Sequence, residues 1–166
     1  MSKKTLNRSE FRIYKNKDYD EVFSFFKKFA DEADLLYLKS NPNQLSKREK
    51  IKKIKDSFEH AVGNRLQKYL LIDSDTGDIV AFYSFHPPSK MVEWIFVNPN
   101  YYFSERILNS ATDFFKKMRQ KYYLKSIYTR LLKRANFKRY VKFVCKHYNG
   151  EVVYEAENYT AVEFKM

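Results

Sequence analysis

Glycine, proline and cysteine are all scarce in this chain of 166 residues, which contains three glycines, four prolines and one cysteine, Cys145. The first two shortages exclude a low-complexity linker or tail, and a single cysteine excludes an internal disulfide and a cysteine-cluster metal site. No apolar run approaches the roughly 18 residues that a membrane span needs, and the first ten residues lack the apolar core of a signal peptide. We therefore expect one soluble domain over residues 1–166, located in the cytoplasm, with no membrane partner.

Acidic residues are missing from the whole stretch 114–150, although it is rich in cations. Nine aromatic residues are interspersed among these cations, and the remainder of the chain is electrically neutral at a total net charge of +12. Such a block attracts a polyanion, which leaves a phosphate-bearing cofactor, a nucleic acid or an acidic protein as its partner. The cations are Lys116, Lys117, Arg119, Lys121, Lys125, Arg130, Lys133, Arg134, Lys138, Arg139, Lys142 and Lys146.

Several motifs with well-understood chemistry are also absent. The three histidines, His60, His86 and His147, have no H-x-x-H or H-E-x-x-H spacing, so we expect no metal site. There is no Walker loop, no dinucleotide-binding fingerprint and no G-x-S-x-G nucleophile motif. Cys145 lies at helical spacing from Val141 and Val144, which indicates a core residue rather than a nucleophile.

Hydrophobic periodicity and turn residues predict the order β-α-α-β-β-β-α-β-α-β-β, an α+β domain around a mixed sheet. Ser46 with Glu49, and Asp18 with Glu21, have the spacing of helix capping boxes. Residues 31–43 are expected to form a loop or short helix. The predicted strands are 11–14, 68–72, 79–85, 91–97, 125–131, 151–156 and 159–165, and the helices follow Asp18, Ser46, Ser104 and Asn136.

This order and four segments resemble the GNAT family of N-acetyltransferases over nearly the whole chain. The segments are FRIYKNKDYDEVFSFF, YLLIDSDTGDIVAFYSF, MVEWIFVNPNYYFSERILNSATDFF and NFKRYVKFVCKHYNGEVVYE. The resemblance implies a mainly antiparallel sheet flanked by about four helices. It also implies transfer of an acetyl group from acetyl-CoA to an amine acceptor.

The cofactor loop departs from the family pattern. Family members hold the pyrophosphate with backbone N–H groups of a Q/R-x-x-G-x-G/A loop that opens the third helix. The corresponding stretch here, NPNYYFSE from Asn98 to Glu105, has no glycine, and Tyr101, Tyr102 and Phe103 either fill a cofactor site or line one. The cofactor-binding residues that the resemblance implies are Phe96, Val97, Tyr102, Ser104, Arg106, Arg134, Asn136 and Arg139.

Acyl transfer needs a base for the amine and an acid for the departing thiolate. On the strand 91–97, Glu93 is the candidate base, because family members often carry a glutamate there and alternation places it opposite Val92 and Trp94. His86 is an alternative base by its intrinsic pKa. The tyrosine that the family uses as acid falls on Phe143, so Tyr140 is the candidate acid and Tyr148 a weaker one.

A second class of function remains open at this point. Cations with interspersed aromatics also suit phosphate contacts and base stacking. In lacking the glycine loop, the chain also resembles small phage-encoded proteins with a degenerate GNAT-like fold, which implies a catalytically weak or inactive module that binds nucleic acid or another macromolecule. A further alternative is a GNAT-like enzyme that modifies bases in DNA, as the phage Mom family does. For a phage-encoded protein the host cytoplasm is the expected location.

Overall fold

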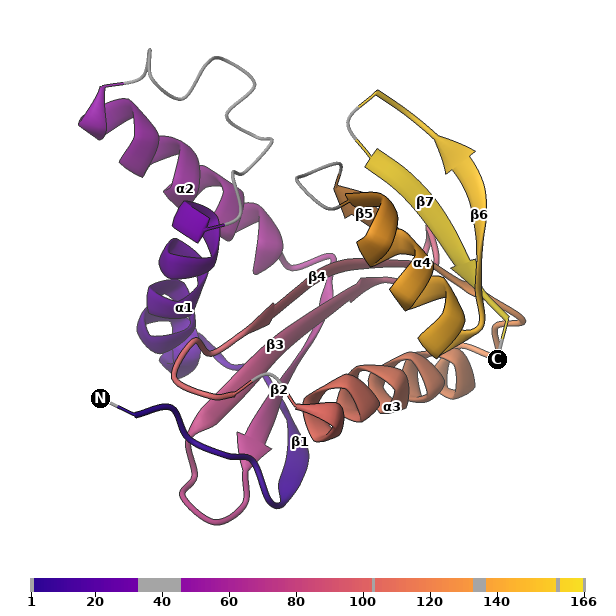
Figure 1. The fold of residues 1–166 in the computed structure, drawn as a ribbon. Helices are drawn as coiled ribbons and strands as arrows, with labels where there is room; N and C mark the ends of the chain where they lie inside the picture. The colour runs from indigo at the N-terminus through magenta and orange to yellow at the C-terminus, as the bar shows by residue number, and fades with distance from the viewer. Residues whose placement is uncertain (1, 33–45, 103, 133–136, 158, 166) are drawn as a thin grey trace. The chain divides into compact units, whose positions relative to one another are not determined.

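A computed structural model describes residues 2–32, 46–102, 104–132, 137–157 and 159–165 of the chain (Figure 1). Its helices and strands follow the order that the sequence predicts, with one additional short 3-10 turn. They are β1 (Ser9–Ile13), η1 (Asn16–Asp18), α1 (Tyr19–Glu32), α2 (Lys47–Ala61), β2 (Gln67–Asp73), β3 (Ile79–His86), β4 (Met91–Val97), α3 (Glu105–Lys121), β5 (Ile127–Leu132), α4 (Phe137–Tyr148), β6 (Gly150–Glu155) and β7 (Tyr159–Phe164).

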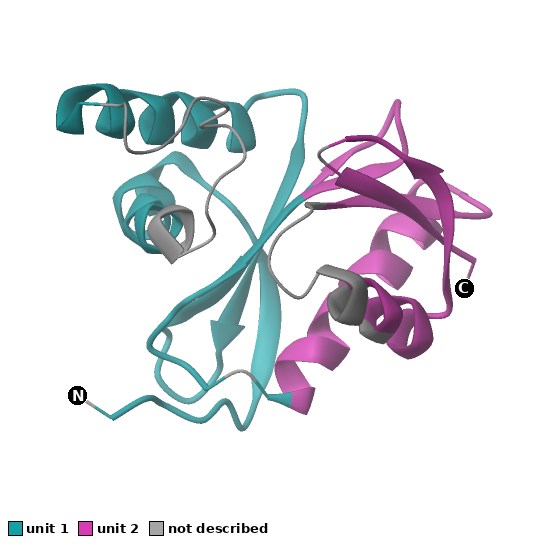
Figure 2. Cartoon of the chain, turned by 45° about the horizontal axis from the view of Figure 1, so that its top comes forward, with its two compact units in different colours: residues 1–84, 94–104 teal, residues 85–93, 105–166 magenta. Residues whose placement is uncertain are grey.

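The strands form a mixed, mainly antiparallel sheet of seven strands in the order β1-β2-β3-β4-β5-β7-β6. The pairs β1–β2, β5–β7 and β6–β7 are antiparallel, and β4–β5 is parallel. The predicted α+β class with a mixed, mainly antiparallel sheet is therefore confirmed. The chain divides into two compact units, one of residues 1–84 and 94–104 and the other of residues 85–93 and 105–166 (Figure 2). Each unit is described by itself below.

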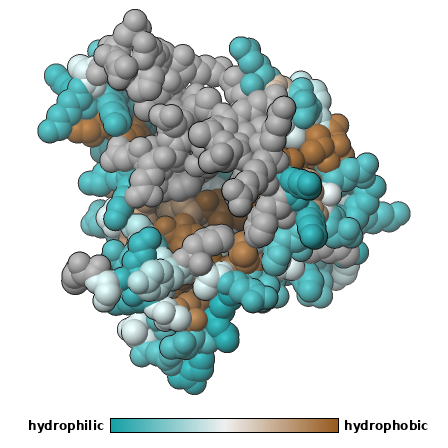
Figure 3. All heavy atoms as spheres, in the orientation of Figure 1, coloured by the Kyte–Doolittle hydropathy of each residue, from teal (hydrophilic) through white to brown (hydrophobic). Residues whose placement is uncertain are grey.

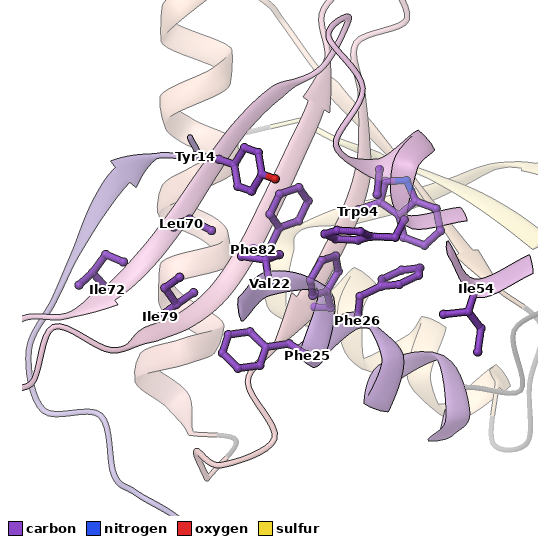
Figure 4. Packing of buried hydrophobic residues seen from close by; sticks show 13 residues of the cluster. Tyr14, Val22, Phe25, Phe26, Ile54, Leu70, Ile72, Ile79, Phe82 and Trp94 are labelled. Atoms are coloured by element: carbon purple, nitrogen blue, oxygen red, sulfur yellow. The ribbon is translucent and has the colours of Figure 1, made fainter. Parts of the chain in front are cut away.

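Aromatic rings build the core of the first unit (Figure 4). The ring of Phe26 on α1 makes edge contacts with Trp94 and Phe96 of β4, at centroid distances of 5.5 and 5.3 Å. Phe96 also stacks on Phe82 of β3 at 4.7 Å, and Phe58 brings α2 against Phe26 at 5.3 Å. Each such aromatic pair contributes about 0.5–1.5 kcal/mol beyond the area that it buries. This cluster fixes which face of β4 is buried.

The two predicted helix caps have different outcomes. The capping box before α2 is confirmed, because Glu49 N donates to Ser46 Oγ at 3.2 Å and Ser46 N donates to the Glu49 carboxylate at 3.3 Å. Asp18 does not cap α1 from outside the helix but lies in the turn η1. Its carboxylate accepts hydrogen bonds from Lys15 N at 2.8 Å and from both terminal nitrogens of Arg12 at 2.9 Å. Residues 33–45, with most of the predicted loop 31–43, lie outside the described residues.

In the second unit, α3 and α4 pack with strand β7. Phe115 of α3 stacks on Phe164 of β7 with a centroid distance of 5.0 Å. Tyr148, the last residue of α4, is buried and donates a hydrogen bond from its hydroxyl to Leu108 O at 3.0 Å. The edge strand β6 leaves three apolar side chains exposed, and Figure 3 shows hydrophobic side chains gathered over β6 and β7. The three are Val152, Val153 and Tyr154.

Candidate functional site

The parallel ladder between β4 and β5 is short. It joins Met91 with Tyr128 and Val92 with Thr129, and the Thr129 hydroxyl donates to Val92 O at 3.4 Å. Glu93 on β4 and Arg130 on β5 are the next residues beyond this ladder. Backbone groups that leave a ladder need other hydrogen-bond partners, so the end of this ladder is a place where a ligand can bind.

Glu93 lies on the face of β4 opposite the aromatic core. The side chains along β4 alternate between buried and half-buried, and Val92 and Trp94 are among the buried ones while Glu93 is half-buried. Among the residues that the structure describes, the Glu93 carboxylate has no hydrogen-bond or ion-pair partner. A partly sheltered carboxylate of this kind is chemically able to accept a proton.

His86 ends strand β3 and is half-buried. Its Nδ1 lies 2.7 Å from the hydroxyl oxygen of Ser89 in the turn that follows. The hydrogen bond fixes the orientation of the imidazole and leaves Nε2 as the nitrogen for any proton transfer.

Arg130 was named from the sequence only as one of the cations of the acid-free block 114–150 and not as a candidate site residue. Its exposed guanidinium lies 5.4 Å from the centre of the Tyr159 ring, across the antiparallel pair β5–β7. A signal was present, because β5 is the strand that runs through the acid-free block. The sequence could not show that Arg130 lies one residue beyond the β4–β5 ladder, because this depends on where the pairing of the two strands ends.

The backbone amides of the loop after β4 already have acceptors within the first unit. Tyr101 N donates to Asn98 O at 3.1 Å, and Tyr102 N donates to Lys4 O at 2.9 Å. Asn98 N donates to Val80 O at 2.7 Å, and Asn100 N to the Asn98 side chain at 2.9 Å. Position 99 is a proline and has no amide proton. The described part of this loop, residues 98–102, therefore offers no spare N–H group to a pyrophosphate.

The Tyr101 ring packs inside the first unit. It is buried, and its hydroxyl donates to the Asp73 carboxylate at 2.8 Å and lies 3.2 Å from Asp78. Burial and the hydrogen bond to Asp73 raise the pKa of Tyr101 far above its usual value. Lys4 completes the group with a 2.6 Å ion pair to Asp78. The side chain thus anchors the loop to the β2–β3 hairpin. Tyr102, by contrast, is exposed, and Phe103 lies outside the described residues.

The other predicted cofactor contacts fall into three groups. The Phe96 side chain is enclosed in the aromatic core, whereas Val97 is half-buried on the other face of β4. Ser104 directly precedes α3, and Arg106 is exposed in the first turn of that helix. Asn136 and Arg134 lie outside the described residues, and Arg139 and the candidate acid Tyr140 lie on α4 with side chains outside them.

Because the loop 98–102 has no free amide, the first turn of α3 is the place where a phosphate group of the implied cofactor could bind. The leading N–H groups of a helix have no acceptor within the helix, and the helix dipole favours an anion there. Arg106 adds a cation in that turn, while Glu105 adds an opposing charge. The residues therefore fit a phosphate at the helix start, and do not fit one along the loop 98–102.

Three further features concern metal binding, the single cysteine and the helices. In the described part of the chain, no group of three His, Cys, Asp or Glu side chains is placed to hold a metal ion. The Cys145 thiol is half-buried, and burial raises its pKa, which opposes a role as nucleophile. Among the helices that the structure describes, none is long and apolar enough to span a bilayer.

Comparison with solved structures decides the fold. An acetyltransferase from Thermus thermophilus matches with a TM-score of 0.64 at 11% identity, over 97% of this chain and 99% of that chain. This chain has the GNAT fold. The paia N-acetyltransferase of Thermoplasma acidophilum, in complex with coenzyme A, matches with a TM-score of 0.64 at 11% identity, over 96% and 100% of the two chains.

Another structure with the GNAT fold is a point mutant of the spermidine N-acetyltransferase SpeG of Vibrio cholerae. It matches with a TM-score of 0.60 at 8% identity, over 94% of this chain and 92% of that chain. No family model and no curated protein matches the sequence. At sequence identities of 8–11%, the similarity shows the GNAT fold alone. The chemistry has to be argued from the residues of this chain.

Proposed function

We propose that this protein is an N-acyltransferase that transfers an acetyl group from acetyl-CoA to an amine. The observation that carries the proposal is the half-buried, unpartnered Glu93 carboxylate, directly beyond the β4–β5 ladder in the described part of a GNAT fold. The likeness to N-acetyltransferases supports it, among them one in complex with coenzyme A and PseH of Campylobacter jejuni in complex with acetyl coenzyme A.

The groups that would hold the cofactor are the backbone amides of Glu105 and Arg106 in the first turn of α3 and the Arg106 guanidinium, which forks onto phosphate oxygens. Arg134 and Arg139, which precede and begin α4, are further candidates for its phosphates. When bound, acetyl-CoA supplies an activated thioester carbonyl.

Glu93 would act as the general base. An amine attacks a carbonyl only when it is neutral, and the Glu93 carboxylate would accept the proton that the ammonium group must lose, directly or through one water. His86 Nε2 is the alternative acceptor. Tyr140 would donate a proton to the departing sulfur, whereas the Tyr148 hydroxyl is already bonded to Leu108 O.

A glutamate-to-glutamine exchange tests this role. We expect Glu93→Gln to lower kcat/KM for acetyl transfer to a panel of primary amines by about 10²–10⁴-fold, the usual contribution of a general base. The readout is release of the free thiol, and acetyl-CoA binding by calorimetry should remain unchanged, because glutamine keeps the shape of the side chain.

The matched control is Glu151→Gln on the edge strand β6, where the carboxylate is exposed and pairs only loosely with Lys165 at 3.7 Å. This variant should retain the wild-type rate. Full activity of Glu93→Gln, together with a loss in His86→Gln, would transfer the role of base to His86. Full activity of both variants would contradict the proposed chemistry.

A further inference from the structure

The end of α3 and the turn that follows it carry five cations within ten residues and no acid. This segment, residues 116–125, is called the basic turn from here on. The last acidic residue before it is Asp113, and the next one along the chain is Glu151. The cations are Lys116, Lys117, Arg119, Lys121 and Lys125.

The lysines of the basic turn are not needed to cap the helix. The backbone itself satisfies three of the last four carbonyls of α3, since those of Met118, Arg119 and Gln120 accept hydrogen bonds from the amides of Tyr122, Leu124 and Tyr123, respectively. The Arg119 side chain adds a bond to Leu124 O at 3.1 Å. Lys116 and Lys125 are exposed and have no partner for their ammonium groups among the described residues. Their charge is therefore available to a ligand.

An exposed aromatic ring lies among these cations. Tyr123 has a φ of +53°, a left-handed conformation that glycine adopts without strain and tyrosine does not. Its side chain is 95% exposed. The neighbouring Tyr122 is half-buried, with its ring 5.6 Å from that of Phe85 and the Lys121 ammonium 5.5 Å from its centre. The turn thus buries one tyrosine and presents the other to solvent, at a cost in backbone strain that suggests a function.

The basic turn is distant from the helix start where a cofactor phosphate would bind. Helix α3 has 17 residues. At 1.5 Å per residue, its two ends are about 25 Å apart. A ligand of the basic turn is therefore separate from a phosphate held in the first turn of α3.

We propose that the basic turn binds single-stranded nucleic acid, with Tyr123 stacked on an unpaired base and Lys116 and Lys125 beside the phosphates. Stacking on an aromatic side chain together with cations that follow the backbone is how sequence-tolerant single-strand binders work. A duplex hides the faces of its bases, so a solvent-facing ring matches an unpaired base. An acidic protein segment would use the lysines but would leave the Tyr123 ring without a matching surface.

The test is fluorescence anisotropy of the full chain with a labelled oligo-dT of about 20 nucleotides, longer than the site of a typical single-strand-binding domain. Tyr123→Gly removes the ring and relieves the left-handed strain, so the dissociation constant should rise about five-fold or more, while Tm stays equal or rises. Tyr123→Phe keeps the ring and should bind like the wild type. Lys116→Ala with Lys125→Ala should flatten the slope of log K against log salt by about 1.4.

Lysines of α2 provide the matched charge control. Lys52 and Lys55 are exposed on α2, and their double alanine variant lowers the net charge equally. It should leave the affinity within about two-fold of the wild type. The proposal is overturned if Tyr123→Gly binds as tightly as the wild type, or if both lysine pairs weaken binding equally. It is also overturned if polyglutamate competes as well as unlabelled oligo-dT does, or if no binding occurs at low salt.

Discussion

At the scale of single residues, Tyr101 shows how one hydroxyl group determines what the loop after β4 does. Its bond to the buried Asp73 carboxylate ties the loop to the β2–β3 hairpin. Lys4 pairs with the same loop through its backbone. A loop held in this way keeps its amides for the protein, so a cofactor phosphate would bind at the start of α3 instead.

Removal of that hydroxyl should destabilise the protein. We expect Tyr101→Phe to lower the free energy of unfolding by about 1–3 kcal/mol, because the buried Asp73 carboxylate loses a hydrogen bond. Tyr102→Phe, one residue further on and 53% exposed, should change it by less than about 0.5 kcal/mol. Urea denaturation measures both, and equal effects of the two variants would contradict the anchoring role of Tyr101.

Asp18 gives a prediction with a defined pH dependence. Burial alone would raise the pKa of Asp18, but hydrogen bonds from Arg12 and from Lys15 N outweigh it and lower the pKa. A carboxyl group with a lower pKa in the folded chain stabilises the fold above its unfolded pKa of about 4. This contribution is lost as the pH falls through the folded pKa.

Asp18→Asn should therefore cost about 2 kcal/mol of unfolding free energy at pH 7. The difference from the wild type should shrink as the pH is lowered beneath about 4. Urea denaturation between pH 7 and pH 2 checks this, with Asp56→Asn on the exposed side of α2 as the control. A difference that stays constant over the whole range would show that the charge of Asp18 is not the cause.

At the scale of elements, the junction between α4 and β6 assigns different roles to two neighbouring residues, Asn149 and Gly150. Glycine is the residue that most often adopts the left-handed conformation at the end of a helix. Asn149 is the residue in the left-handed conformation, with a φ of +54°. Gly150 instead begins β6, where a Cβ would lie 2.8 Å from Val162 and 2.9 Å from Phe164. The glycine is needed for close packing of the strand pair and not for the turn.

This assignment predicts opposite responses at neighbouring positions. Gly150→Ala should cost about 1–3 kcal/mol of unfolding free energy, because the added methyl group overpacks the β6–β7 pair. Asn149→Gly should stay within about 0.5 kcal/mol. There the relief of the left-handed conformation offsets the lost bond from Asn149 Nδ2 to Lys165 O. Thermal or urea unfolding distinguishes the two, and a larger loss at Asn149 would contradict the assignment.

At the scale of the whole molecule, local sequence patterns predict most of the helices and strands. The contacts between residues remote in sequence could not be predicted from them. Strand β4 has the bounds that were predicted, because alternation of buried and half-buried side chains is a local signal. The Ser46–Glu49 box is equally local. The bond between Tyr101 and Asp73 joins residues 28 positions apart, and the end of the β4–β5 ladder depends on register, so no sequence period reveals either.

The candidate site likewise has one feature that the sequence predicts and one that it does not. The face on which Glu93 lies follows from alternation, and the half-buried position of its side chain agrees with that prediction. The state of the loop amides does not follow, because their acceptors include Lys4 and Val80, which are remote in sequence. The loop 98–102 has none of the glycines of the family pattern, and its backbone amides are already hydrogen-bonded within the protein. The two observations agree, because the glycines of the family loop serve to bring free amides close to a pyrophosphate.

Titration of the purified protein with acetyl-CoA by isothermal calorimetry tests the central claim most directly. If the chain is an acetyl-CoA-dependent acyltransferase, binding should saturate with a dissociation constant in the micromolar to millimolar range that is usual for enzyme substrates. Arg106→Ala should weaken that binding. The absence of any binding heat at millimolar acetyl-CoA would contradict the claim.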